Sequence, residues 1–191
     1  TVLDGIDIAS ANDILFSSTV AVDAGDLDLT STGDIDFTGI VTTANMGTVT
    51  ISVGDAALDT LTIPANFNLD GAFLQVGAGS VDISANITTT DDNIDFMGDM
   101  TLSGPVILDT GAGLGNIILN PNSVTGVQIL TLDAGTGDIT LDDLNVTTIS
   151  FTDGNDLTLN GDISVDNAFD TTILDGTITV AGGDDSSITT T

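Results

Sequence analysis

Residues 137–146 read GDITLDDLNV, and this stretch contains the pattern that decides the fold. It begins with a five-residue unit, 137–141, made of a turn residue, a small polar residue, an aliphatic residue, any residue and an apolar residue. Two aspartates follow, and then a second short alternation runs from Leu144 to Val146. Alternation with a period of two predicts β-strands, and Gly and Asp at the breaks predict tight turns.

The same unit recurs ten times, and its first position is always Gly, Asn or Asp, residues that tolerate the left-handed backbone of tight turns. The copies begin at Asn12, Gly33, Gly47, Asp59, Gly79, Asp92, Gly115, Gly137, Asn155 and Gly176. Six of the nine intervals are 18–23 residues, and three are 12–14, about the length of a partial circuit. Second short strands are expected at 40–42, 67–69, 100–102, 144–146 and 163–165. Each block therefore predicts strand, turn, strand, turn.

Short strands at a period near twenty residues predict an all-β fold, a parallel β-solenoid with coils of 18–23 residues. Coils stacked roughly 4.8 Å apart would make residues 1–191 a single segment on the order of 40 Å long. The competing architecture is a tandem β-sandwich of the immunoglobulin kind. It requires long Greek-key connections and usually a core Trp or Tyr, which this chain lacks.

The repeat also predicts which side chains form the core. The third and fifth residues of each unit should face inward and stack on their counterparts one coil away: Ile14/Phe16, Ile35/Phe37, Val49/Ile51, Leu61/Ile63, Val81/Ile83, Ile94/Phe96, Ile117/Leu119, Ile139/Leu141, Leu157/Leu159 and Ile178/Val180. The fourth residue should face outward. In that outward column Asp82 and Asp95 are successive, an unfavourable pair of like charges.

The composition excludes whole classes of function. The chain contains no Lys, Arg, His, Cys, Trp, Tyr or Glu, all 29 acidic residues are Asp, and the net charge is −29. Without basic side chains it cannot neutralise phosphate, so nucleic acid and anionic membrane surfaces are not expected as partners. No disulfide can form, and the apolar runs are too short to insert into a bilayer.

An enzymatic role is not expected. Paired carboxylates are the only catalytic arrangement that the composition permits, and the candidate pairs are Asp91/Asp92, Asp142/Asp143 and Asp184/Asp185. A glycosidase-like site also needs side chains that hold a sugar, and the usual ones are missing. Triads that use His or Cys are impossible in this chain.

Calcium is the one ion that the acidic turns suggest, because Ca²⁺ prefers carboxylate and carbonyl oxygens. The candidate ligands are Asp23, Asp26, Asp28, Asp91, Asp92 and Asp95, and smaller clusters occur at Asp153/Asp156 and Asp184/Asp185. No EF-hand or glycine-rich nonapeptide pattern supports them, so solvated turn residues are the competing interpretation. No cofactor is required. Two sequons, at Asn86 and Asn145, would permit glycosylation.

Three runs resemble the repeats of filamentous-haemagglutinin-type proteins, which are large secreted bacterial adhesins and related giant surface proteins. They are GDLDLTSTGDIDFTG (25–39), LTLDAGTGDITLDDLNV (130–146) and DGNDLTLNGDISV (153–165). The resemblance implies a right-handed parallel β-helix and a prokaryotic, extracellular or cell-surface location. It also implies a role in adhesion or fibre formation. A complete absence of Lys and Arg is unusual for that family.

These observations predict a non-enzymatic structural element of a surface filament, fibre or adhesin stalk. Neither end carries a polar cap in the sequence, so we expect the coils to continue into more protein, either along a longer repetitive chain or by stacking of identical copies. The alternative is an adhesive module that binds divalent cations or surface glycans. An ice-binding solenoid would need a regular Thr-x-Thr face, which only three of the ten units supply.

Overall fold

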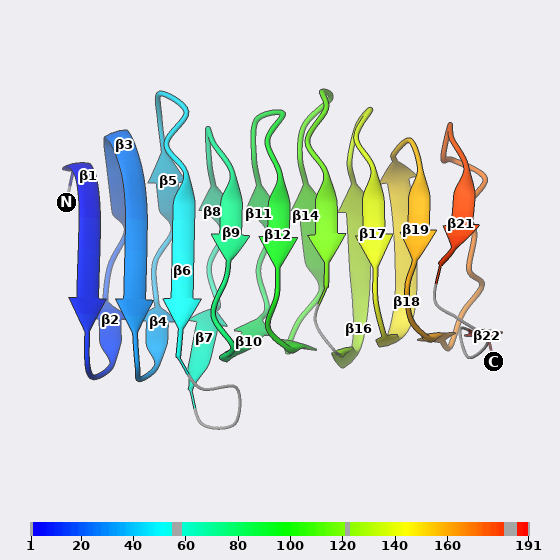
Figure 1. Ribbon diagram of the computed structural model, residues 1–191, viewed down its shortest axis with the longest axis horizontal. Coiled ribbons are helices and arrows are strands. Elements are labelled where there is room, and N and C mark those ends of the chain that lie inside the picture. Colours follow the sequence, from blue (N-terminus) through cyan, green and yellow to red (C-terminus); the bar gives the residue numbers. More distant parts are fainter. Residues whose placement is uncertain (1, 55–58, 121–122, 182–186, 191) are drawn as a thin grey trace.

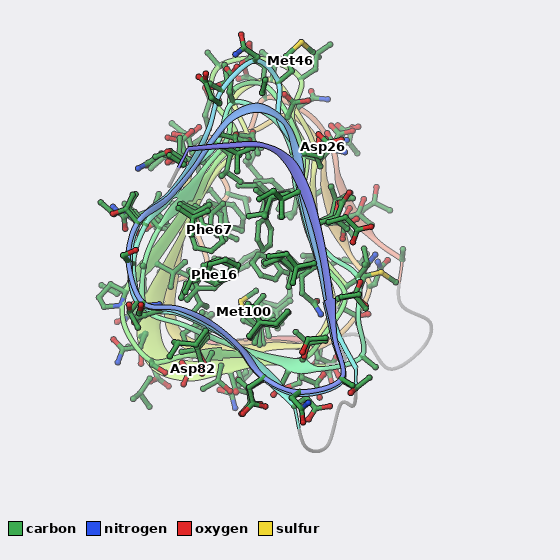
Figure 2. The ribbon with its side chains drawn as sticks, turned by 90° about the vertical axis from the view of Figure 1, so that its left-hand side faces the viewer. Phe16, Asp26, Met46, Phe67, Asp82 and Met100 are labelled. Carbon is green, nitrogen blue, oxygen red and sulfur yellow. The ribbon has the colours of Figure 1, made fainter. Side chains whose placement is uncertain are left out.

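In the computed structural model, the chain winds into a single rod of stacked coils (Figure 1). The structure describes residues 2–54, 59–120, 123–181 and 187–190, and for residues 2–4 the backbone alone. In this part of the chain all strand pairs are parallel, and no helix could cross a membrane. Each coil has a triangular outline with side chains filling the interior (Figure 2). The predicted all-β parallel solenoid is confirmed.

The strands lie on three faces, which we number in the reverse of chain order, and a coil usually has a strand or part of a strand on each of them; residues 166–177 of the last described coil contain no strand. Face 1 contains β2 (Ile14–Phe16), β4 (Ile35–Phe37), β7 (Thr60–Ile63), β10 (Ser80–Ile83), β13 (Met100–Leu102), β20 (Ile163–Val165), β22 (Ile188–Thr190) and the first residues of β16 (Val124–Asp133) and β18 (Leu144–Asp153). Face 2 contains β6 (Val49–Val53), β9 (Phe73–Gln75), β12 (Ile94–Phe96), β15 (Ile117–Leu119), β17 (Ile139–Leu141), β19 (Leu157–Leu159), β21 (Ile178–Val180) and the second halves of β1 (Val2–Ser10) and β3 (Val20–Ser31). Face 3 contains β5 (Val41–Thr43), β8 (Phe67–Asn68), β11 (Ile87–Thr88), β14 (Val106–Asp109) and the remaining parts of β1, β3, β16 and β18.

The coil is right-handed and makes about eight turns. In Figure 1 the strands nearest the viewer, among them β6, β9 and β12, run downward, while the strands behind them run upward. The chain advances from left to right at the same time, which defines a right-handed helix. The handedness implied by the resemblance is therefore correct.

The prediction of two strands per coil is wrong, because a third strand lies on face 3. The expected strands at 40–42 and 67–69 correspond to β5 and β8 on face 3, whereas those at 100–102, 144–146 and 163–165 lie on face 1. Face 3 carries strands as short as two residues, and these are too brief to show the five-residue unit.

The ten units do not form one column as predicted. Four lie on face 1, at Asn12, Gly33, Asp59 and Gly79, and the other six lie on face 2. Each of the three intervals of 12–14 residues joins a unit on one of these faces to a unit on the other. The partner of Ile35 one coil away is therefore Leu61, and not Val49. The coils also differ in length, since the coil from Ile139 to Leu157 is much shorter than the coil from Ile35 to Leu61.

Asp82 and Asp95 are likewise not neighbours. Asp82 lies on face 1 between Thr62 and Thr101, and Asp95 lies on face 2. The like-charge pair expected from the sequence does not exist.

The first residue of each unit also has a different role from the one predicted. None of the ten has a positive φ. On face 2 the position lies directly over its counterpart in the previous coil, and a Cβ at Gly137 would collide with the carbonyl oxygen of Gly115. Gly47 approaches the carbonyl of Gly25 in the same way. Close stacking of the turns, and not left-handed backbone, selects glycine there.

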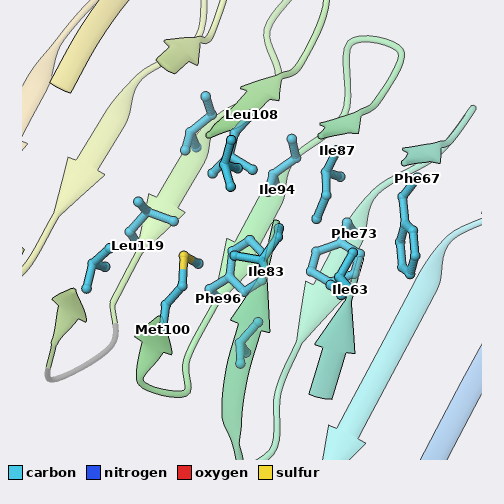
Figure 3. Packing of buried hydrophobic residues seen from close by; sticks show 14 of the residues in the cluster. Ile63, Phe67, Phe73, Ile83, Ile87, Ile94, Phe96, Met100, Leu108 and Leu119 are labelled. Atoms are coloured by element: carbon cyan, nitrogen blue, oxygen red, sulfur yellow. The ribbon is translucent and has the colours of Figure 1, made fainter. Parts of the chain in front are cut away.

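Inward-facing aliphatic and aromatic side chains form one continuous core (Figure 3). Five Phe rings from all three faces run through the first half of the rod, with successive centroids 4.9, 4.9, 5.9 and 5.0 Å apart: Phe16, Phe37, Phe67, Phe73 and Phe96. The predicted inward pairs are buried from Ile35/Phe37 to Leu157/Leu159. The exceptions are at the ends: Phe16 is partly exposed, and Ile178 and Val180 are 46% and 55% exposed because no described coil covers them.

Candidate functional site: the corner ladders

Asp and Asn side chains that accept hydrogen bonds from the backbone lie at the three corners, where the chain passes from one face to the next. A corner leaves the backbone N–H before each strand without a partner in its own coil. In this molecule the side chain of an Asp or Asn in one coil accepts a hydrogen bond from that N–H in the next coil. The bonded residues are therefore about 18 to 26 positions apart in sequence.

The longest of these ladders precedes face 2. Asn93 Oδ1 accepts from the N–H of Asn116 at 2.8 Å, and Asn116 Oδ1 accepts from the N–H of Asp138 at 2.8 Å. Asp138 Oδ1 accepts from the N–H of Asp156 at 3.1 Å, and Asp156 Oδ1 accepts from the N–H of Thr177 at 2.6 Å. Four successive coil junctions are thus linked by one type of bond.

The other two corners use the same bond. Before face 1 four such bonds occur, and in each pair the first residue accepts from the backbone N–H of the second: Asp13 and Asp34, Asp34 and Thr60, Asp143 and Asp162, Asp162 and Ser187. Before face 3, they are Asn66 with Asn86 and Asn86 with Ile107, both at 3.0 Å. Asp and Asn have one methylene between backbone and acceptor oxygen, which matches a coil spacing of about 4.8 Å.

The first acidic trio separates into individual roles. Asp26 Oδ1 accepts from the N–H of Thr48 at 2.9 Å, as part of the corner before face 2. Asp28 faces outward on β3, and the backbone carbonyl of Asp23 accepts from the side-chain amide of Asn45. All three aspartates are exposed, and Figure 2 shows Asp26 on the outside of the rod.

The second trio is divided between a turn and a strand. Asp91 has a φ of 61° and donates its N–H to the carbonyl of Thr110, and the carbonyl of Asp92 accepts from the hydroxyl of Thr89. Asp95 lies outward on β12. Among the residues that the structure describes, no three acidic side chains come together as a potential metal site. Calcium binding therefore stays a prediction.

The other candidate aspartates that the structure describes also have structural partners. Asp142 Oδ1 accepts from the N–H of Asp143 at 3.1 Å, and Asp143 belongs to the ladder before face 1. Asp153 Oδ1 accepts from the N–H of Gly154, whereas Asp156 belongs to the ladder before face 2. Asp184 and Asp185 lie outside the described residues.

Asp95 does not belong to a ladder, and its surroundings are apolar. Its neighbours in the adjacent coils are Leu74 and Ile118, so the carboxylate lies between two aliphatic side chains. Its Oδ1 atom is buried without a hydrogen-bond partner in the described structure. Burial raises the pKa of Asp95 above its ordinary value of 3.8. The exposed Met97 and Val76 continue this apolar strip on the outside of face 2.

The pKa of Asp170 is shifted in the opposite direction. The backbone N–H of Thr172 donates to Asp170 Oδ1 at 2.9 Å, and this bond together with the Thr172 hydroxyl lowers the pKa of the carboxyl below its ordinary value of 3.8. The residue is fully exposed, so the effect is local to that turn.

A hollow of about 450 Å³ lies on the outside of face 3, at its border with face 2. Its polar lining consists of Thr and Asn or Asp side chains from three consecutive coils: Thr43, Asn68, Asp70, Thr88 and Thr90. Asp70 Oδ2 accepts from the N–H of Met46, and its own N–H is donated to the hydroxyl of Thr43, so part of this wall is held rigidly.

The two sequons differ in accessibility. Asn86 is bonded through its N–H and its Oδ1 as a member of the ladder before face 3. Asn145 faces outward on face 1, with Thr125 and Ser164 as its neighbours in the adjacent coils, and it is exposed. Glycosylation stays a prediction for both.

Sequence reasoning assigned the corner aspartates to turns, but it missed that they connect successive coils. The signal was available at the second position of the unit, where Asp or Asn occurs in six of the ten copies. Comparison of the chain with protein-family models, with curated proteins and with solved structures finds no match, so the resemblance to filamentous-haemagglutinin-type repeats stays a prediction.

Proposed function

We propose that this chain is a non-enzymatic structural element of an extracellular filament, fibre or adhesin stalk. In this role its function is to be long, stiff and chemically inert. It continues along one axis into further coils and holds other parts of the assembly at a distance from the cell.

The observation that carries the proposal is that each described coil pairs in parallel with its neighbours through backbone hydrogen bonds, with buried side chains between them. At many corners the ladders add a second connection between coils, and the aliphatic side chains pack on one another inside the rod. A fold in which each coil contacts only its neighbours can be extended along one axis by the addition of further coils.

The composition suits exposure outside the cell. Trypsin-like proteases have no cleavage site, because the chain contains neither Lys nor Arg. A net charge of −29 keeps rods apart and in solution. Without Cys, the fold does not depend on the redox state of its surroundings.

The test is localisation combined with shape. Antibodies raised against the purified chain should label intact cells of the producing organism, and brief protease treatment of those cells should remove an epitope attached beyond the rod while the rod epitope persists. Labelling that appears only after the cells are permeabilised would refute the proposal.

Glycan binding is the second candidate, and the hydroxyl- and amide-lined hollow on face 3 favours it. Thr and Asn side chains that converge in a shallow groove can bond sugar hydroxyls. A glycan array should then give a hit that disappears in Asn68→Ala. The outward-facing Asn145→Ala serves as the control that leaves the signal unchanged.

A further inference from the structure

Two hollows on the outside of face 3 adjoin each other and form one groove. The hollow of about 450 Å³ described above and a second hollow of about 260 Å³ share Thr43 and Ala44 in their linings. The second hollow adds Ala21 and Asp23 from the preceding coil. The groove therefore extends over four successive coils, and its long direction is the axis of the rod.

The lining of the groove is ordered in two rows that follow the register of the strands. The first row is the outward position of face 3 in four adjacent coils: Ala21, Thr42, Asn68 and Thr88. The second row lies two residues later in each of the same coils: Asp23, Ala44, Asp70 and Thr90. Consecutive members of a row are one coil apart, so each row spans roughly 14 Å along the axis.

The polar side chains of the first row are available to a ligand. Within the residues that the structure describes, the side chains of Thr42, Asn68 and Thr88 make no hydrogen bond. The nearby Asn66 and Asn86 differ, because their side chains accept backbone N–H groups in the ladder before face 3. Three successive coils thus each offer a hydroxyl or an amide on the outside of the rod.

The second row is held in place by bonds between coils. The N–H of Asp70 donates to Thr43 Oγ1 at 2.8 Å, and Asp70 Oδ2 accepts from the N–H of Met46 at 2.9 Å. Met46 and the preceding Asn45 have φ angles of 63° and 57°, a left-handed backbone that is uncommon outside glycine. The side-chain amide of Asn45 donates to the carbonyl of Asp23 at 2.6 Å, so bonds to both neighbouring coils hold this turn. Such fixed, strained turns occur mainly at functional sites, and this one places the exposed Met46 at the corner beside the groove (Figure 2).

The chemistry of the groove fits an extended chain of uncharged sugars. Hydroxyls, an amide and carboxylates all form hydrogen bonds with sugar hydroxyls. A sulfated or uronic acid chain would be repelled by Asp23, by Asp70 and by the net charge of −29. A hexose in an extended β-linked chain advances by about the distance between two coils, so successive sugars meet equivalent positions of the rows.

The first row also has a defined end. In the three coils after Thr88 its place is taken by Asp109, Asp133 and Asp153. One carboxylate oxygen of each of these residues accepts a backbone N–H within its own turn. The run of uncharged positions is therefore limited to four coils.

We propose, as a refinement that depends on the glycan-binding candidate above, that this groove binds a linear β-1,4-linked chain of uncharged hexoses along the axis of the rod. One sugar unit lies on each coil, and the groove accommodates four units. Thr42, Asn68 and Thr88 bond hydroxyls along one edge of the glycan, and Asp23 and Asp70 accept from hydroxyls along the other. A ligand of this kind lies parallel to the rod on its flank.

The experiment measures affinity as a function of chain length. Isothermal titration calorimetry of the purified chain uses three β-1,4-linked series of two to six units, composed of glucose, mannose or N-acetylglucosamine. In the series that binds, affinity should rise roughly threefold to tenfold with each unit up to four, the gain expected from one net hydrogen bond per sugar, and should then level off. Malto-oligosaccharides contain glucose in α-linkage and curve away from a straight row, so they should bind roughly tenfold more weakly than β-linked glucose chains of equal length.

Substitutions locate the sugar units on the coils. Thr88→Val removes the hydroxyl of the last coil with little change in shape, so affinity should level off at three units instead of four. Thr88→Ser retains the hydroxyl and should keep the limit at four. Thr140→Val makes the same replacement at an outward position of face 2 and should leave binding unchanged. Thermal unfolding followed by circular dichroism checks that the three variants are as well folded as the wild type.

The outcomes separate this inference from the broader candidate. Affinity that does not change with chain length, equal binding of α- and β-linked glucose chains, or a limit that Thr88→Val does not move would overturn the axial arrangement. The same holds if none of the three β-1,4-linked series binds. Glycan binding in general would survive each of these results if an array hit still depended on Asn68, and it would fail without such a hit. Surface labelling tests the structural role separately.

Discussion

Replacement of Asp95 by Asn should stabilise the protein at neutral pH. The carboxylate lies between Leu74 and Ile118, has a buried oxygen without a partner, and has a pKa that burial raises above 3.8. Such a carboxyl binds a proton more readily in the folded chain than in the unfolded chain. Its contribution to stability is therefore greatest below pH 3.8 and is lost as the pH rises through the raised pKa.

The expected gain is small because Asp95 is only partly buried. Side-chain pairs on a sheet surface are worth about 0.2–1 kcal/mol, and solvent screens a half-exposed charge. We therefore expect Asp95→Asn to raise the free energy of unfolding by about 0.5 kcal/mol at pH 7, and the gain should vanish below about pH 4.

The measurement is urea unfolding of the wild type and the variant across this pH range. Because the other aspartates also titrate, only the difference between the two proteins is informative. Asp36→Asn provides the matched control, since Asp36 lies outward on face 1 between Leu15 and the polar Thr62, and its replacement removes the same charge. An equal gain from the control, or a gain from Asp95→Asn that does not depend on pH, would refute the reasoning.

The remaining predictions concern the ladders and the core. Asn116→Ala should cost about 1 kcal/mol, because the N–H of Asp138 loses its acceptor, whereas Asn116→Asp should retain most of the stability; chemical denaturation distinguishes the two. Phe67→Ala should cost about 3–5 kcal/mol in the same assay, since the side chain is fully buried between two other rings, and a cost below about 1 kcal/mol would contradict the core described above. Gln75→Leu should lower the free energy of unfolding by about 1–3 kcal/mol although Gln75 is fully buried, because Gln75 Oε1 accepts from the N–H of Gly98 at 2.7 Å. Hydrogen exchange of the Gly98 amide should become faster in the variant.

The ladders explain why so many aspartates are compatible with a folded rod. Consecutive members of a ladder lie in adjacent coils, where two carboxylates in contact would repel. A backbone N–H lies between consecutive carboxylates of a ladder. Asp138 Oδ1, for example, accepts from the backbone N–H of Asp156, and the carboxylate of Asp156 accepts in turn from the N–H of Thr177. Mixing in Asn, as at Asn93 and Asn116, reduces the repulsion further.

Aspartates that are close in sequence point in different directions for a geometric reason. Asp91, Asp92 and Asp95 are close in sequence, but a strand turns successive side chains to opposite faces and a corner changes their direction again. Outward-facing neighbours in adjacent coils are a full coil apart in sequence, as Leu74, Asp95 and Ile118 are. Clusters that are read along the chain therefore do not identify clusters in space.

The sequence by itself determined the class of the fold and the identity of the core. Period-two alternation and the ten units were sufficient, because a strand buries every second side chain wherever it lies. Only the tertiary structure decided that there are three faces and which coil covers which. The corners make some coils longer than others, so vertical register depends on backbone pairing between residues that local patterns do not connect. The cross-coil bonds of Asp and Asn depend on that register, since each acceptor meets its N–H only after a full turn of the chain.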